Sequence, residues 1–188
     1  MPFTFSKLNL SDVMVIQSEI FNDDRGFLLE TYDDSQFRDA GIHVNFQLDI
    51  LSRSKTGVIR GLHFQRPPYQ QAKLIYCSEG QILDVAVDIR KESDTFGDHV
   101  SLILAEDSNR MLFIPPGFAH GFAVMGGPAK VHYKLSNRYA PDYQAGIRWD
   151  DPFLNIDWQI QEPTVSNRDS SLPDFQDIKP LSRDYVKR

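Results

Sequence analysis

The chain has little cysteine, no long apolar run and no excess of positive charge. Its single cysteine, Cys77, excludes an internal disulfide and a metal site built from several thiolates. No apolar run approaches the roughly 20 residues that a membrane-spanning helix requires. The first residues also lack the charged and apolar regions of a signal peptide. We therefore expect a cytoplasmic protein without a membrane segment.

The charge balance argues against nucleic acid as a partner. Twenty Lys and Arg residues against 26 Asp and Glu residues give a net charge of −6, whereas domains that bind nucleic acid usually carry basic patches. An acidic protein can still bind an anion in a locally basic pocket. With 188 residues, 41% of them hydrophobic, the chain is long enough for a single domain over 1–188 with a sizeable core.

Short strand-like segments, separated by turn signals, run through most of the chain. The predicted strands cover residues 13–21, 27–32, 44–51, 57–65, 73–77, 81–89, 100–105, 111–114, 121–125 and 130–136. One short helix is predicted at 35–41, with Asp34 or Ser35 as its N-cap. Strands at this spacing predict an all-β sandwich or barrel. The C-terminal tail, residues 166–188, has few apolar residues and is expected either to wrap the surface or to become disordered near its end.

The segment 57–65 carries polar side chains where a purely structural strand would be apolar. Arg60 and His63 are three residues apart, so a regular strand would direct them to opposite faces. Gly61 lies between them and permits a bulge that turns both side chains inward. Lys73 opens the next predicted strand. Together these groups predict a pocket rather than a plain apolar core.

The spacing of glycines and histidines resembles the two motifs of the cupin superfamily, which are small double-sheet barrels of the jelly-roll type. Gly57 and His63 hold the spacing of the first motif. Pro115, Gly117 and His120 hold that of the second. The resemblance implies a double-stranded β-helix with a few short helices.

Two departures from the cupin motifs bear on metal binding. Metal-binding cupins hold the ion with histidines and a glutamate, but Gln65 and Lys73 stand at two of those positions here. An ammonium group repels a cation, and the two remaining histidines, His63 and His120, are too few for a usual site. We expect a pocket without metal or cofactor, whose cationic groups suit an anionic substrate or a developing oxyanion.

Several local patterns together resemble the 4-keto-6-deoxyhexose 3,5-epimerases of the dTDP-rhamnose pathway. They are DRGFLLE (24–30), VIRGLHFQ (58–65), LDVAVDIR (83–90), IPPGFAHGF (114–122), YK (133–134), GIRWDDP (146–152) and SNRD (166–169). Their order and distances along the chain are specific for this family. The resemblance implies an isomerase that inverts C3 and C5 of a nucleotide-activated sugar. The expected reaction converts dTDP-4-dehydro-6-deoxy-D-glucose into dTDP-4-dehydro-L-rhamnose.

The same resemblance implies roles for four residues. His63 matches the family's base, Asp169 would orient its ring, Lys73 would neutralise an enolate, and Tyr133 matches the proton donor. These residue types suit the chemistry, because epimerisation beside a ketone needs a base, an enolate-stabilising group and an acid on the opposite face. No redox cofactor is required, since the ketone is already present. Asp84 is a further candidate contact of the base or the lysine.

The resemblance also implies a homodimer. In the family, the segment that matches Arg25 and Glu30 reaches across a dimer interface, so N-terminal strands within about 1–45 are expected there. The predicted substrate contacts are Arg25, Glu30, Asp49, Arg60, Lys73, His120, Tyr139, Gln144 and Arg168.

Several alternatives stay open on the sequence alone. Tyr139 competes with Tyr133 for the role of acid. Residues 48–51 read LDIL where the family usually reads QDNH, Gln144 replaces a glutamate, and Arg168 replaces a lysine. These departures fall in the segments that recognise the substrate. They leave room for a 3-only epimerase or a ketoisomerase acting on a related nucleotide sugar, and for a non-catalytic sugar-binding cupin.

Overall fold

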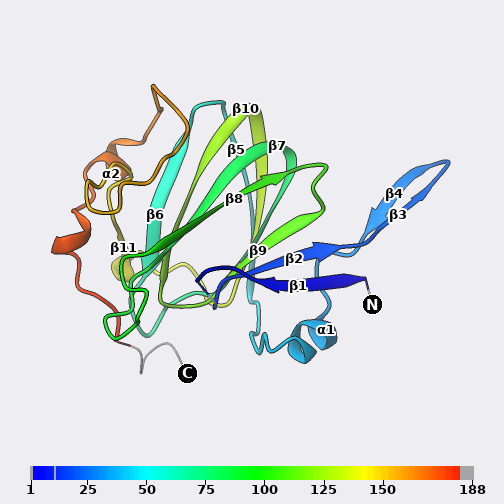
Figure 1. The fold of residues 1–188 in the computed structure, drawn as a ribbon, viewed down its shortest axis with the longest axis horizontal. Helices are drawn as coiled ribbons and strands as arrows, with labels where there is room; N and C mark the ends of the chain where they lie inside the picture. The colour runs from blue at the N-terminus through cyan, green and yellow to red at the C-terminus, as the bar shows by residue number, and fades with distance from the viewer. Residues whose placement is uncertain (1, 11, 183–188) are drawn as a thin grey trace.

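Strands make up most of the regular structure (Figure 1) in the computed structural model, which describes residues 2–10 and 12–182. The main sheet runs in the order β1 (Phe3–Lys7), β2 (Met14–Ser18), β9 (Arg110–Ile114), β7 (Lys73–Asp88), β10 (Phe118–Leu135), β6 (Ile59–Gln65) and β11 (Gln144–Gly146). In addition, β5 (Leu48–Ser54) pairs with β10, and β8 (His99–Ala105) pairs with β7. The all-β prediction is confirmed.

The remaining elements are short. β3 (Ile20–Asp23) and β4 (Gly26–Leu29) form a separate hairpin that projects from the sheet (Figure 1). The helices are α1 (Asp34–Asp39) and α2 (Asn167–Ser170), with 3-10 turns η1 (Pro141–Tyr143) and η2 (Phe175–Asp177). Within the described ranges, no helix has the length and apolar character needed to cross a membrane.

The two longest strands, β7 and β10, pair with each other over nearly their full length. The antiparallel register runs from Phe118 opposite Asp88 to Leu135 opposite Lys73, with shifts only at the centre. The predicted strand end at 78–80 is wrong, because Gly80, at φ +76°, forms a bulge through which β7 continues. The predicted break after residue 125 is wrong for the same reason, since β10 also continues through its glycines.

Two smaller boundaries also differ from the prediction. The N-cap of α1 is Asp33 rather than Asp34 or Ser35, because the Asp33 carboxylate accepts the Gln36 N–H at 2.8 Å. β5 starts four residues later than the strand predicted at 44–51. It ends at Ser54, the last of its residues that pairs with β10.

Apolar side chains from the sheet and from the C-terminal segment fill the interior. One buried cluster joins strand residues such as Leu62 and Val85 to Trp158 and Phe175 from the segment after β11. The tail covers the sheet with its few apolar residues, and Leu181 is 5% exposed. The last six residues of the predicted tail lie outside the described residues.

The strands β6 and β10 approach each other closely at two glycines. Gly61 has φ +119°, and a Cβ added to it would lie 2.5 Å from the Gly121 Cα. A Cβ added to Gly121 would lie 2.8 Å from the Arg60 carbonyl oxygen. The ladder is irregular at this point, where His120 is opposite His63 but Phe122 is opposite Arg60. The irregularity lets Arg60 and His63 line one cavity, as predicted.

Candidate active site

A cavity of about 320 Å³ opens among β5, β6, β7 and β10. The polar side chains that line it are Ser52, Arg60, His63, Gln71, Lys73, His120, Tyr133 and Gln144. All of these except Ser52 and Gln71 are predicted site residues. Strand alternation places Ser52 on the same face as Ile50, because the two residues are two apart on β5. Ile50 is the cross-strand neighbour of Tyr133, so this face is the one that meets the cavity. No sequence signal marks Gln71.

His63 and Asp169 form a hydrogen-bonded pair at one side of this cavity. The His63 Nε2 lies 2.7 Å from Asp169 Oδ1, and the other carboxylate oxygen accepts the Gly61 N–H at 3.3 Å. Asp169 sits in the first turn of α2, where its own N–H donates to the N-cap Ser166 at 3.1 Å. Burial raises the pKa of Asp169, but the His63 contact and the Gly61 bond outweigh it and lower the pKa overall.

This pair determines which nitrogen of His63 can act as a base. An ionised carboxylate only accepts hydrogen bonds, so it selects the neutral tautomer that carries its proton on Nε2. The unprotonated nitrogen is then Nδ1. Asp169 is 4% exposed, whereas His63 reaches the cavity. The geometry therefore provides an oriented imidazole at the cavity, and the role of His63 as the base stays a prediction.

Lys73 brings a positive charge to the same cavity. Its side chain is buried, and Nζ donates to the His63 carbonyl oxygen at 3.2 Å. Burial lowers the pKa of Lys73 to about 8, against an opposing effect of the Asp84 charge. At neutral pH the ammonium form therefore predominates, and it can stabilise negative charge on a bound molecule.

Tyr133 enters the cavity from β10. Its hydroxyl lies 3.5 Å from Ser52 Oγ, and burial raises the pKa of the phenol above its ordinary value. Its neighbours in sequence are paired elsewhere, because His132 contacts Ser78 Oγ at 2.8 Å and Lys134 contacts Asp49 at 2.9 Å. The strand therefore alternates at Tyr133, with a protonated phenol inside the cavity.

His120 and Asp84 form a second imidazole–carboxylate pair deeper in the cavity wall. Asp84 is fully buried and its Oδ1 contacts His120 Nε2. Asp84 therefore bonds to His120 rather than to the base His63. Burial lowers the pKa of His120, although the Asp84 charge opposes this shift.

Gln65 does not face the cavity, although it stands at a cupin metal-ligand position. Its amide nitrogen donates to the carbonyl oxygens of Tyr69 at 2.6 Å and Arg138 at 3.1 Å, and its oxygen accepts the Ala140 N–H at 2.8 Å. Gln65 thus ties together the two loops before Lys73 and after β10. Sequence reasoning missed this role, since the partners are backbone groups distant in sequence.

Several predicted substrate contacts lie away from the cavity within one chain. Arg25 is exposed on the β3–β4 hairpin, where it pairs with Asp23. Asp49 binds Lys134, whose neighbour Tyr133 points the other way. The exposed residues Glu30, Tyr139 and Arg168 also do not line it. The Tyr139 hydroxyl nevertheless reaches the cavity residue Gln144, donating to its Oε1 at 2.6 Å.

The chain as a whole is similar to known proteins. The sequence model of dTDP-4-dehydrorhamnose 3,5-epimerase matches residues 7–177 of this chain. The chain belongs to this epimerase family. The family consists of isomerases with a cupin-like all-β fold, so the predicted fold and enzyme class are confirmed.

Individual members show how far the similarity extends. The dTDP-4-dehydrorhamnose 3,5-epimerase of Shigella flexneri is 43% identical over 91% of this chain and 95% of its own length. The Legionella pneumophila epimerase, solved in complex with dTDP-4-keto-L-rhamnose, is 35% identical with TM-score 0.92, covering 96% of this chain and 98% of its own. A 3'-monoepimerase from Streptomyces bikiniensis, in complex with dTDP, is 26% identical with TM-score 0.88, covering 95% and 92%.

The hydrogen bond between His63 and Asp169 predicts which ring nitrogen of His63 carries the proton. When the His63 ring is neutral, we expect its proton on Nε2, because the Asp169 carboxylate can only accept a hydrogen bond. In Asp169→Asn, the amide can accept or donate, so both tautomers should be populated. Nitrogen-15 NMR of the histidine side chains measures this directly. Asp84→Asn is the control, and a His63 signal that changes in the control but not in Asp169→Asn would contradict the assignment.

Proposed function

We propose that this chain inverts C3 and C5 of dTDP-4-dehydro-6-deoxy-D-glucose to give dTDP-4-dehydro-L-rhamnose. The observation that carries the proposal is the meeting in one cavity of an oriented imidazole, a buried ammonium and a buried phenol. The Legionella relative, which binds dTDP-4-keto-L-rhamnose, supports the choice of sugar. We also place the reaction in the cytoplasm, on the sequence features given above.

The residues divide the reaction into two proton transfers at each carbon. His63 removes the proton next to the C4 ketone, and the electron pair of the broken C–H bond moves onto the carbonyl oxygen as an enolate. The Lys73 ammonium stabilises that oxygen. Tyr133 then gives its proton to the same carbon from the opposite face, which inverts it. His63 releases the abstracted proton to solvent and the Tyr133 phenolate takes one up before the second carbon reacts. Asp169 keeps His63 oriented throughout.

A second candidate is inversion at one carbon only. The similarity to the Streptomyces bikiniensis 3'-monoepimerase favours it, and so does Ile50, an apolar residue on the cavity wall where the family usually has an asparagine. Both candidates share proton removal by His63. They differ in how many carbons receive a proton from the opposite face.

Incubation in deuterium oxide tests the function. We expect the wild-type enzyme to introduce solvent deuterium at both C3 and C5 of dTDP-4-dehydro-6-deoxy-D-glucose, because each inversion replaces one carbon-bound hydrogen. In His63→Ala, the exchange rate should fall by roughly 10²–10⁴-fold, as is typical when a general base is lost. NMR locates the label. Label at C3 alone would establish the single-inversion alternative, and no label in the wild type would refute an epimerase acting on this sugar.

Replacing the phenol separates proton removal from proton return. In Tyr133→Phe, we expect His63 still to exchange the substrate hydrogen, while inverted product falls by at least about 10²-fold because the acid is missing. Mass spectrometry follows the label and NMR follows the product. Tyr139→Phe is the matched control, since its hydroxyl binds Gln144 at the cavity. Normal inversion in Tyr133→Phe, with loss of inversion in the control, would transfer the acid role to Tyr139.

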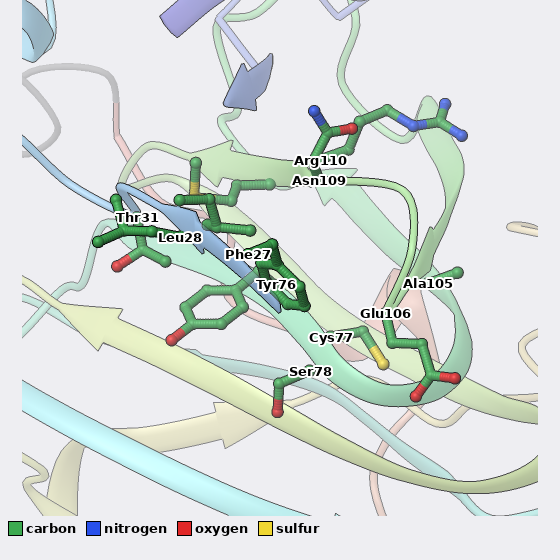
Figure 2. A pocket seen from close by; sticks show the side chains of 12 residues that line it. Phe27, Leu28, Thr31, Tyr76, Cys77, Ser78, Ala105, Glu106, Asn109 and Arg110 are labelled. Atoms are coloured by element: carbon green, nitrogen blue, oxygen red, sulfur yellow. The ribbon is translucent and has the colours of Figure 1, made fainter. Parts of the chain in front are cut away.

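We further propose a homodimer that uses the β3–β4 hairpin. Phe27 and Leu28 on this hairpin are 66% and 63% exposed. Below the hairpin, a largely apolar hollow of about 370 Å³ extends to Tyr76 and Cys77 on β7 (Figure 2). Apolar surface of this kind is usually covered by a partner. A second copy of the chain would also place Arg25 and Glu30 where the family uses them.

The dimer can be tested by light scattering. We expect twice the monomer mass at micromolar concentration, and a shift to monomer in Phe27→Asp because a carboxylate would be buried unpaired at the interface. Ile103→Asp, on the exposed side of β8, should remain dimeric. A wild-type monomer with full activity would contradict the proposal.

A further inference from the structure

We propose that Asp84 is a positioning residue that acts through Lys73, and that its buried negative charge keeps the Lys73 ammonium charged inside the cavity. This inference rests on the proposed function in one respect only, which is that the Lys73 charge stabilises an enolate. The claim about Lys73 itself stands on the arrangement of charged groups around it.

Asp84 is buried in an unusual way for a carboxylate. Its exposure is 0%, and its only hydrogen bond among the described residues is the one from His120 to Oδ1. The second oxygen, Oδ2, is buried and has no hydrogen-bond partner in the described part of the chain. A buried carboxylate is costly unless a positive charge compensates it. The compensating charge must come from within the cavity.

His120 does not supply that charge. Burial lowers the pKa of His120, which favours its neutral ring, and the ring contacts Asp84 Oδ1 through Nε2. Arg60 is directed to Ser54, donating to its hydroxyl at 2.9 Å. Arg60 is also exposed, so Lys73 is the buried cation among the described residues that line the cavity.

The effect on Lys73 follows from the balance between burial and charge. Burial favours the neutral amine, and the Asp84 charge is the electrostatic influence that opposes it. The ionisable groups that line the cavity or back it are Arg60 and His63 on β6, His120 and Tyr133 on β10, Asp84 on β7 and Asp169 on α2. Asp169 is already engaged by His63 and Gly61. Asp84 is thus the carboxylate whose charge is left for Lys73.

Replacing Asp84 with asparagine distinguishes charge from orientation. The amide oxygen that Asp84→Asn introduces can still accept the His120 Nε2–H, so His120 keeps its orientation. The negative charge is lost, however. A residue that served only to orient His120 would leave the ionisation of Lys73 unchanged by this replacement.

The experiment is a pH titration of Lys73 by carbon-13 NMR of its ε-carbon, assigned with Lys73→Met. We expect the wild-type ammonium to lose its proton near pH 8, and the midpoint to fall by at least about one pH unit in Asp84→Asn, a tenfold change in the ratio of charged to neutral lysine. Asp88→Asn is the control, because Asp88 is also fully buried on β7 but pairs with Arg90. Its Lys73 midpoint should match the wild type.

Activity provides the second readout. The alkaline limb of the kcat/KM profile should move to lower pH by the same amount in Asp84→Asn, while the acidic limb stays in place. An unchanged Lys73 midpoint in a folded Asp84→Asn or Asp84→Ser variant would overturn the proposal. So would a wild-type Lys73 that is already neutral at pH 7, a result that needs no variant to fold.

The titration requires no substrate, so it separates the two proposals. A shifted Lys73 midpoint without any epimerase activity in the wild type would refute the proposed function and leave the role of Asp84 intact. An active enzyme with an unshifted midpoint would do the reverse.

Discussion

The candidate site depends on the pairing of β7 with β10. Each strand contributes two of its ionisable groups, Lys73 and Asp84 from one and His120 and Tyr133 from the other. The members of each pair are an odd number of residues apart, so a regular strand would direct them to opposite faces. They meet because the pairing register shifts at the central bulge, which changes the alternation and brings both to the cavity side. A slip of one residue in either half would turn a lysine or a tyrosine to the outer face and leave the cavity without it.

The cavity brings together buried ionisable groups that are unfavourable for the stability of the fold. A lysine, two carboxylates and a histidine, all less than a tenth exposed, line or back a space of about 320 Å³. Removing such groups from water destabilises a protein unless partners compensate. Here each carboxylate holds a histidine, and both pairs lie close to the lysine. The benefit of this arrangement is catalytic, because a preorganised charge needs no rearrangement when negative charge develops on a substrate.

Sequence reasoning located the ionisable residues on the strands that line the cavity, but it missed Ser52 on β5. Gly61 between Arg60 and His63 predicted that both would face inward, and they do. It failed at Gly80, because a glycine can either end a strand or form a bulge inside one. Only the pairing of β7 with β10 distinguishes the two cases. It also could not pair Asp84 with His120, because their contact depends on a register between distant segments. The roles of Arg25 and Glu30 need a second chain and stay predictions.

The close contact of β6 with β10 limits where this pocket can change. A methyl group on Gly61 would meet the Gly121 Cα, and one on Gly121 would meet the Arg60 carbonyl oxygen, so neither glycine can be replaced without a shift of the backbone opposite. A compensating second substitution offers no relief, because the obstruction is main chain on both sides. The backbone beside the cavity residues Arg60 and His120 is therefore fixed at this crossing. Adaptation to a different sugar or nucleotide is therefore confined to rim positions such as Ile50 and Gln144, which are among those that depart from the family pattern.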